Sequence, residues 1–359
     1  MASSRNAIGL LACQLAATAL AYVVPPTSPV PYPQLHYSKA TQFQAGNEPI
    51  LNVSHAQFST ESAQAYSLVS SYDSSNWMSK FSVQAISDPT HGYVNYVSQQ
   101  QAQSQGLYKV IGNQVYIGVD NTSVLNPSGL GRNSVRLMSN TAYNQGLVIG
   151  DFAHIPGTEC GSWPAFWMVG PNWPSSGEID IIEGVNLMNT NQMTLHTSPG
   201  CTVSVGSGGQ SGSSVGSADC GDGGGYNGCP VVSNTGTSYG TPFDNVKGGG
   251  VYAMQWTASN IKIWYFPRNG VPSDISSGKP NPSGWGQPQA NFAGCDFSSY
   301  MKNQNIIFDI TFCGDWAGQV WNNYASCKNS NPSCNGYVAQ NPNVFSDVYW
   351  LINSVKVYQ

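Results

Sequence analysis

The chain has 359 residues, a length that suits one large domain or two small ones. Charged residues make up 9% of it, far below the ~25% of an average soluble protein, and the formal net charge is −5. Nucleic-acid binding depends on Lys and Arg side chains that neutralise phosphates, so this composition argues against it. A neutral polar surface with 19 tyrosines is typical of extracellular proteins that handle neutral polymers.

The N-terminus has the pattern of a secretory signal peptide over residues 1–21. Arg5 supplies a positive charge, Ala7–Leu20 is apolar, and Ala19-Leu20-Ala21 fits a small-residue cleavage site. A short membrane anchor is the alternative, but the apolar run is shorter than the ~20 residues of a spanning helix. We therefore expect a secreted protein, extracellular or in the cell wall, without membrane attachment after cleavage.

Residues 22–40 are predicted to form an extended proline-rich linker, and residues 41–359 a single domain. Asn52 and Asn121 begin glycosylation sequons, which matter only in a host that glycosylates exported proteins. The best candidate for a helix is Thr60–Val69.

From about residue 41 the chain consists of short β-rich runs separated by Gly, Pro, Asn and Ser. The clearest expected strands are residues 81–86, 114–119, 134–138, 251–256, 261–266, 306–310 and 352–357. Short strands bounded by turn residues favour an all-β sandwich. The Gly/Ser-rich stretch Val203–Gly228, with cysteines in and beside it, is expected to be a long surface loop and not a linker between domains.

The cysteines favour disulfides. Cleavage after residue 21 would remove Cys13 and leave eight cysteines, an even number, at positions 160, 201, 220, 229, 295, 313, 327 and 334. A zinc site is the alternative, but the spacings of nine (220 to 229) and seven (327 to 334) are unlike the short spacing of zinc knuckles. Eight cysteines allow 105 pairings, so the sequence does not choose the connectivity.

Three carboxylates occur within the segment Gly177–Gly184, although the chain has only five glutamates. The segment is short, β-branched and bounded by glycines, which favours a strand. Glu178 and Asp180 then share one face, whereas Glu183 points to the other. A β-bulge of one residue at Ile181-Ile182 would return Glu183 to the shared face. Such a set suits acid/base and nucleophilic chemistry on a sugar, with the two glutamate carboxyls ~5–5.5 Å apart in a retaining enzyme.

Two alternatives remain for this segment. An exposed acidic strand does not suit isoleucines at 179, 181 and 182. A calcium site is the other, because three carboxylates on one face can bind a hard cation, although calcium sites usually draw on loops rich in Asp and Asn. We expect no catalytic metal and no cofactor.

The segment resembles the Glu-x-Asp-x-x-Glu signature of glycoside hydrolase family 16, in the bulged form typical of its laminarinase-like branch. Further stretches resemble fungal endo-1,3(4)-β-glucanases of that family over about residues 60–359: 88–96, 134–136, 163–167, 191–197 and 311–316. The resemblance implies a β-jelly-roll of two curved antiparallel sheets with a substrate cleft on the concave face. It implies that Glu178 is the nucleophile, Glu183 the general acid/base and Asp180 the residue that modulates the nucleophile. A covalent glycosyl-enzyme intermediate and net retention follow.

The resemblance also selects tryptophans that would stack on glucose rings. Flat indole faces match the apolar faces of sugars, and the candidates are Trp163, Trp167, Trp173 and Trp256. In a chain with ten tryptophans, a role in the core is the alternative.

Polar residues complete the candidate site. His196 resembles the family residue that lines the leaving-group side, although a lone histidine is usually structural. Arg136 could face the cleft and donate to sugar hydroxyls, with a surface arginine as the alternative, and the same argument applies more weakly to Asn95. His91 and Asp315 are expected to be structural.

Together these observations predict a secreted, monomeric, endo-acting hydrolase whose partner is a β-1,3 or mixed β-1,3/1,4 glucan. A cell-wall transglycosylase using the same carboxylates is one alternative. A non-catalytic β-glucan-binding protein is the other, and it ranks last because relatives of that kind are expected to lack the motif's glutamates.

Overall fold

The computed structural model of the protein describes residues 66–204, 209–221 and 227–359. The chain divides into a segment Met1–Ser59 and a compact unit Thr60–Gln359. The predicted signal peptide, the proline-rich linker and the Asn52 sequon lie outside the described residues, so the domain boundaries at 21 and 40 stay predictions. The predicted helix Thr60–Val69 also begins outside them, and its end is wrong. Leu68 and Val69 belong to strand β1 (Leu68–Tyr72), because pairing with the C-terminal strand outweighs any local helical preference.

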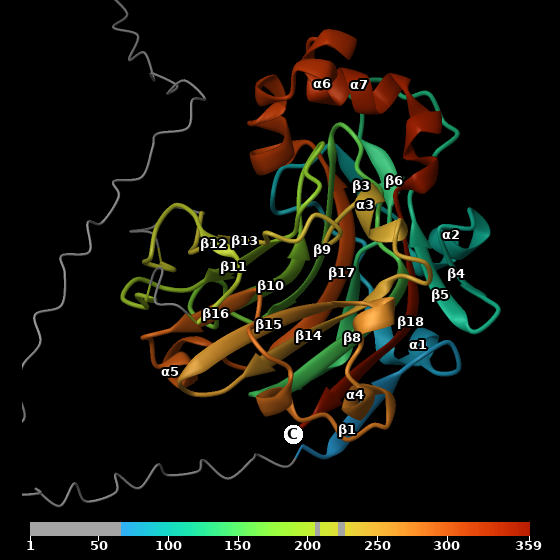
Figure 1. The fold of residues 1–359 in the computed structure, drawn as a ribbon. Coiled ribbons are helices and arrows are strands. Elements are labelled where there is room, and N and C mark those ends of the chain that lie inside the picture. Colours follow the sequence, from blue (N-terminus) through green and yellow to red (C-terminus); the bar gives the residue numbers. More distant parts are fainter. Residues whose placement is uncertain (1–65, 205–208, 222–226) are drawn as a thin grey trace, which may run out of the picture. The chain divides into compact units, whose positions relative to one another are not determined.

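Two eight-stranded antiparallel sheets build this unit (Figure 1). Sheet A has the order β16 (Ala290–Ala293), β15 (Asn260–Pro267), β14 (Gly250–Trp256), β8 (Gly146–His154), β18 (Tyr349–Tyr358), β5 (Gln114–Gly118), β4 (Tyr108–Ile111), and β1 pairs with β18. Sheet B has the order β12 (Ser213–Ser214), β13 (Val231–Val232), β11 (Gln192–His196), β10 (Glu178–Glu183), β9 (Ser162–Val169), β17 (Gln304–Phe312), β7 (Leu137–Tyr143), β2 (Phe81–Val83). The predicted all-β sandwich is confirmed.

The predicted strands correspond to observed ones, with two differences. The run 81–86 is a strand only as far as Val83, in β2. The run 134–138 is divided, because β6 (Arg132–Ser134) pairs in parallel with β3 (Val94–Tyr96), whereas β7 starts at Leu137 and pairs with β17. Residues 135–136, between the two pairings, belong to no strand.

The hydrophobic core lies between the sheets, and sheet A is covered on its other face as well. Along β14, Tyr252, Met254 and Trp256 belong to the core between the sheets, whereas Val251 and Ala253 pack in a second apolar cluster. That cluster includes side chains of the segment that holds α4 (Ser273–Ser276) and η3 (Pro282–Gly284). Burial on both faces explains why this run is almost continuously apolar.

Short helices and turns connect the strands of the described chain. They are α1 (Trp77–Lys80), α2 (Gln99–Ser104), α3 (Thr241–Asp244), α5 (Phe297–Tyr300), α6 (Ala325–Ser330), α7 (Cys334–Gln340), η2 (Arg268–Gly270), η4 (Gly314–Gly318), η5 (Trp321–Asn323) and η6 (Pro342–Asp347). Helices α6 and α7 gather beyond the ends of β9 and β17 (Figure 1). Within the described ranges, no helix has the length and apolar character needed to cross a membrane.

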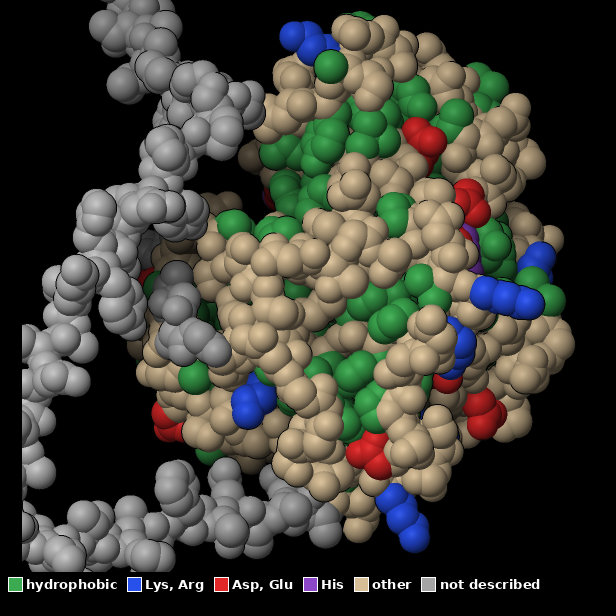
Figure 2. Space-filling model, in the orientation of Figure 1, with side chains coloured by type: hydrophobic (Ala, Val, Ile, Leu, Met, Phe, Trp, Pro, Cys, Tyr) green, Lys and Arg blue, Asp and Glu red, His purple; other side chains and the backbone are tan. Residues whose placement is uncertain are grey.

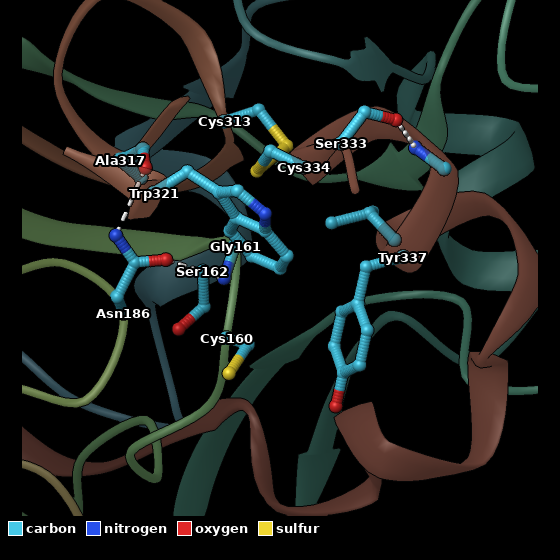
Figure 3. Close-up of a disulfide and its surroundings, with 12 residues drawn as sticks. Cys160, Gly161, Ser162, Asn186, Cys313, Ala317, Trp321, Ser333, Cys334 and Tyr337 are labelled. Carbon is cyan, nitrogen blue, oxygen red and sulfur yellow. Dashed lines mark hydrogen bonds between the residues drawn. A yellow bond between two sulfur atoms is a disulfide. The ribbon is translucent and has the colours of Figure 1, made fainter. Parts of the chain in front are cut away.

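Four disulfides confirm the predicted use of the cysteines. Cys160–Cys327 and Cys313–Cys334 tie the α6–α7 region to the residues beside β9 and β17. Figure 3 shows Cys313–Cys334 beside Trp321, with Asn186 bridging to the Ala317 carbonyl. These links hold the loops at one end of sheet B.

The other two disulfides lie at the two ends of the Gly/Ser-rich stretch 203–228. Cys201–Cys295 links the residues just before the stretch to those after β16, and Cys220–Cys229 links its last part to the residue that follows it. That stretch adds β12 to the edge of sheet B, so it is part of the unit and not a linker. Charged side chains are few and scattered on the face seen in Figure 2, in keeping with the composition.

Candidate active site

Strand β10 contains the bulge that the spacing of the carboxylates requires. Asp180 pairs with Thr194 of β11, but Glu183 pairs with Gln192, so β10 has one residue more than its partner over this stretch. The register with β9 shifts at the same place, between Asp180 and Ile182. The three isoleucines of β10 are fully buried in the core between the sheets: Ile179, Ile181 and Ile182. The carboxylates therefore share the opposite face of sheet B, which we call the carboxylate face.

Neighbouring strands place polar and aromatic side chains on the carboxylate face. On β9, Phe166 and Met168 enter the core, which leaves Trp163, Ala165 and Trp167 on the carboxylate face. Trp167 lies opposite Asp180, and Ala165 lies between Glu183 and Asp309 of β17. The small side chain of Ala165 leaves room between these larger neighbours.

Glu183 is held by both its side chain and its backbone. Trp163 Nε1 donates a hydrogen bond to Glu183 Oε1 at 2.8 Å, and the Glu183 backbone N–H donates to Asn191 Oδ1 at 2.9 Å. Trp163 in turn packs edge-on against Trp316, with ring centroids 5.6 Å apart. Burial raises the pKa of the Glu183 carboxyl well above its ordinary value, and the nearby Asp180 charge adds to the rise. This environment favours the protonated form of the carboxyl, which a general acid requires.

Glu178 and Asp180 form a hydrogen-bonded carboxyl pair. Burial, followed by the charge of Asp180, raises the pKa of Glu178 to about 8, and burial raises the pKa of Asp180 to about 8. His196 Nε2 lies 3.4 Å from Asp180 Oδ2. The charge of His196 and a hydrogen bond from Trp173 both lower the pKa of Glu178, so they favour its ionised form. The hydrogen bond between the two carboxyls acts the other way, because it raises the pKa of Glu178 and lowers that of Asp180, so the shared proton lies on Glu178 in the free protein.

Arg136 reaches the carboxylate face as an ion-pair partner of Asp309. Its guanidinium donates to Asp309 Oδ2 and lies over the ring of Trp167, with Cζ 4.9 Å from the ring centroid. Trp167 Nε1 also donates to Asp309, at 3.4 Å. Burial raises the pKa of Asp309 to about 6, although the charge of Arg136 opposes the rise. The pair thus fixes the orientation of the Trp167 indole.

The remaining predicted site residues have different surroundings. Trp173 is 44% exposed, so its indole can meet a ligand. Asn95 donates from Nδ2 to Asn133 Oδ1 at 2.7 Å, in a polar chain that continues to Gln105, and its role in substrate binding stays a prediction.

The prediction for Trp256 is wrong. Its side chain is 2% exposed and packs in the core between the sheets, so it has no open face for a sugar. His91 and Asp315, expected to be structural, form an exposed pair with Nδ1 and Oδ2 2.8 Å apart.

Sequence reasoning missed three residues that support the site: Asn191, Asp309 and Trp316. Asp309 left a signal, because it interrupts the apolar run Ile306–Ile310 on a predicted strand. Asn191 and Trp316 occur inside the stretches that resemble the family, but only the tertiary structure shows that Asn191 bonds the Glu183 backbone and that Trp316 packs on Trp163.

Among the described residues, two groups bring a histidine and two carboxylates close together. One is Glu178, Asp180 and His196, within the carboxylate cluster itself. The other is His154, Asp244 and Asp347, in which His154 Nδ1 lies 2.7 Å from Asp244 Oδ2. Calcium prefers six to eight oxygen ligands, and neither group supplies such a set.

Comparison with known proteins gives the same family as the motif. The model of the XgeA-like catalytic domain of glycoside hydrolase family 16 matches residues 81–358. A probable endo-1,3(4)-β-glucanase of Aspergillus clavatus is 50% identical over 306 residues, which cover 83% of this chain and 47% of the relative. The endo-1,3(4)-β-glucanase xgeA of Emericella nidulans is 46% identical over 304 residues, covering 83% of this chain and 48% of the relative. The chain thus spans about half the length of these curated relatives.

Solved structures of the same family share the fold. An elongating family 16 β-1,3-glucosyltransferase aligns with a TM-score of 0.77 and 44% identity, over 82% of this chain and 100% of that chain. Laminarinase 16A of Phanerochaete chrysosporium, with 6-O-glucosyl-laminaritriose in both donor and acceptor sites, aligns with a TM-score of 0.76 and 43% identity over the same shares. The expected β-jelly-roll of two antiparallel sheets is confirmed.

Proposed function

This chain belongs to glycoside hydrolase family 16, in its XgeA-like branch, and we propose that it cleaves internal β-1,3 or mixed β-1,3/1,4 linkages of glucans with retention of the anomeric configuration. The observation that carries the proposal is the bulge in β10, which puts Glu178, Asp180 and Glu183 on one face of sheet B. Relatives named endo-1,3(4)-β-glucanase and a laminarinase that holds a β-glucan oligosaccharide support the substrate class.

The reaction uses the two glutamates in turn. Glu178 attacks the anomeric carbon while Glu183 donates its proton to the glycosidic oxygen, so that the bond between carbon and leaving oxygen breaks and a glycosyl ester forms on Glu178. Glu183, now ionised, takes a proton from water, whose oxygen attacks the anomeric carbon and releases Glu178. Two inversions at the same carbon give net retention.

The protonation states follow from the surroundings of each carboxyl. Burial and the nearby Asp180 raise the pKa of Glu183, which favours the protonated form that a general acid needs. Glu178 must be ionised, and the hydrogen bond from Trp173 and the charge of His196 favour that form. In the free protein the hydrogen bond between the two carboxyls raises the pKa of Glu178 and lowers that of Asp180, so Glu178 holds the shared proton and must release it, to Asp180 or to solvent, before it attacks. Uptake of that proton by Asp180 agrees with the modulating function expected for this residue.

Aromatic side chains provide the platforms for sugar rings. Trp173, beside Glu178 and 44% exposed, and Trp167, held by Arg136 and Asp309, are the two we assign. Trp163 serves mainly as a hydrogen-bond donor to Glu183. His196, next to Asp180, is assigned to the leaving-group side.

A cell-wall transglycosylase is the second candidate, because one solved structure with 44% identity is an elongating β-1,3-glucosyltransferase. Such an enzyme uses the same carboxylates but passes the glycosyl group to a sugar hydroxyl instead of water. The presence of both motif glutamates disfavours the third candidate, a non-catalytic glucan-binding protein.

Secretion is supported by the four disulfides, which are typical of oxidising compartments.

Product analysis tests the function. The enzyme is incubated separately with laminarin, lichenan and xyloglucan, and soluble products are sized and quantified by chromatography. Short oligosaccharides from laminarin or lichenan are expected, while products longer than the starting oligosaccharide would favour the transglycosylase. Release from xyloglucan alone would overturn the proposal.

Two variants serve as controls in the same assay. Glu178→Gln and Glu183→Gln should each abolish turnover while glucan binding survives. A rate like that of the wild type from Glu178→Gln would refute its role as the nucleophile.

A further inference from the structure

The bulge that brings Glu183 to the carboxylate face leaves backbone groups without ladder partners. An inserted residue in a strand disrupts the local ladder, and a buried N–H or C=O without a partner is costly. Ile181 and Ile182 are fully buried, so water is not the obvious substitute. Another group must satisfy this stretch of backbone.

Asn191 supplies that group. Its side-chain amide donates from Nδ2 to the Ile181 carbonyl at 2.8 Å, and its Oδ1 accepts from the Glu183 N–H at 2.9 Å. The amide orientation follows from chemistry, because only the oxygen can accept from an N–H. Asn191 thus acts as a substitute peptide group that spans the bulge from one side to the other.

Asn191 is itself firmly positioned. The residue is fully buried, its N–H donates to Ser238 Oγ at 3.0 Å, and its carbonyl accepts from the Ser233 N–H at 2.8 Å. These contacts come from the segment that follows β13, the strand paired with β11. The position of the amide is therefore set by the sheet edge and not by Glu183.

The chain leaving the bulge is also fixed. Tyr239, from the same segment, donates from its hydroxyl to the Gly184 carbonyl at 2.9 Å. A Cβ on residue 184 would lie 2.7 Å from ring atoms of Tyr239, so the close approach requires glycine. Glu183 therefore sits between two anchored points, Ile181 and Gly184.

We infer that Asn191 is a positioning residue for the acid/base Glu183: it maintains the bulge and so keeps that carboxyl on the carboxylate face beside Trp163. The inference rests on the proposed function, because it assumes that Glu183 donates the proton to the leaving group. Asn191 is fully buried, and its side-chain amide bonds the backbone of the bulge and not the carboxyl of Glu183. A displacement of the order of 1 Å at a catalytic group can cost ~10²-fold in rate.

The test compares two leaving groups. A β-1,3-glucan has a poor leaving group and needs the acid. In 2,4-dinitrophenyl β-laminaribioside, the dinitrophenolate leaves without protonation. Asn191→Ala should lower kcat/KM for laminarin by ~10²-fold but that for the aryl glycoside by less than ~10-fold, with KM changed little. Asn191→Asp keeps an oxygen acceptor for the Glu183 N–H and replaces the donor to the Ile181 carbonyl with a carboxyl, so it gives the same measurement in a second variant if the alanine variant folds poorly.

Asn76→Ala is the matched control. Asn76 also bridges a backbone acceptor and a backbone donor, Ser71 and Asp73, but lies between β1 and α1. It should lower the melting temperature and leave both rates within ~2-fold. Equal losses on the two substrates in both Asn191 variants would overturn the inference.

Glu183→Ala separates the inference from the function it rests on. If Glu183→Ala shows the leaving-group difference and the Asn191 variants do not, only the role of Asn191 fails. If Glu183→Ala itself shows no difference, the acid/base assignment fails, and the inference fails with it.

Discussion

Neutralising Glu178 should stabilise the folded protein at neutral pH while it abolishes turnover. The change is Glu178→Gln, which keeps the shape of the side chain and cannot ionise. Burial and the neighbouring Asp180 raise the pKa of Glu178 from 4.5 to about 8 in the folded state. The folded protein thus binds this proton more tightly than the unfolded chain does. The resulting stabilisation is complete below pH ~4.5 and disappears as the pH rises through about 8.

The size of the effect follows from that shift. At pH 7 the solution lies ~2.5 pH units above the ordinary glutamate value, and each unit corresponds to ~1.4 kcal/mol. Because the unfolded chain releases this proton at pH 7 while the folded protein still holds it, the wild type loses at most about 3.5 kcal/mol of stability there, and less after solvent screening since Glu178 is half-buried. The glutamine variant avoids this cost at pH 7 and gains nothing at pH 4.5.

Urea unfolding of both proteins at pH 4.5 and pH 7.5 measures the difference. We expect similar free energies of unfolding at pH 4.5 and a more stable variant at pH 7.5. Asp296→Asn is the control, because Asp296 is an exposed residue at the start of α5 whose pKa is lowered by its hydrogen bonds to Ser299 and Ser298. A Glu178→Gln variant that is less stable than the wild type by the same amount at both pH values would refute the reasoning.

Two further predictions concern the aromatic and charged neighbours of the site. Trp256→Phe should lower the melting temperature and leave KM within ~2-fold, because the Trp256 ring is buried in the core. Trp173→Ala should raise KM severalfold with little loss of stability, because Trp173 is exposed. A raised KM at unchanged stability in Trp256→Phe would contradict the assignment of Trp256 to the core. Arg136→Met should destabilise the protein by ~3–5 kcal/mol at pH 8 in urea unfolding, because it leaves the Asp309 carboxylate buried without its charged partner. The loss should be smaller at pH 5, since Asp309 has a pKa of about 6 even beside Arg136 and takes up a proton there; an equal loss at both pH values would show that the cost is packing and not charge.

The bulge was predictable because a strand has a strict period of two. Three carboxylates in one apolar run, with an odd separation between Asp180 and Glu183, could share a face only if one residue was inserted. The resemblance to the family suggested Trp256 as a sugar platform, and the strand period could not correct it, since β14 is buried on both faces and the sequence carries no sign of which face meets the other sheet.

Features that depend on distant pairing lay beyond the sequence. The cysteine count predicted disulfides, but the link between Cys160 and Cys327 joins residues 167 positions apart and follows from the final packing. Asn191 is eight residues from Glu183 along the chain, and its contact with the bulge exists only in the shifted register of β10 and β11. Arg136 was expected to bind sugar, yet its charge is balanced by Asp309 from another strand.

The central claim is that Glu178 is the nucleophile of a retaining glucanase, and covalent trapping tests it most directly. The enzyme is incubated with an activated 2-deoxy-2-fluoro-β-laminaribioside, digested, and the labelled peptide is sequenced by mass spectrometry. The account predicts one sugar adduct, on Glu178, in the peptide that also contains Glu183. An adduct on Glu183 or Asp180, or an unlabelled enzyme whose natural products have inverted anomeric configuration, would contradict it.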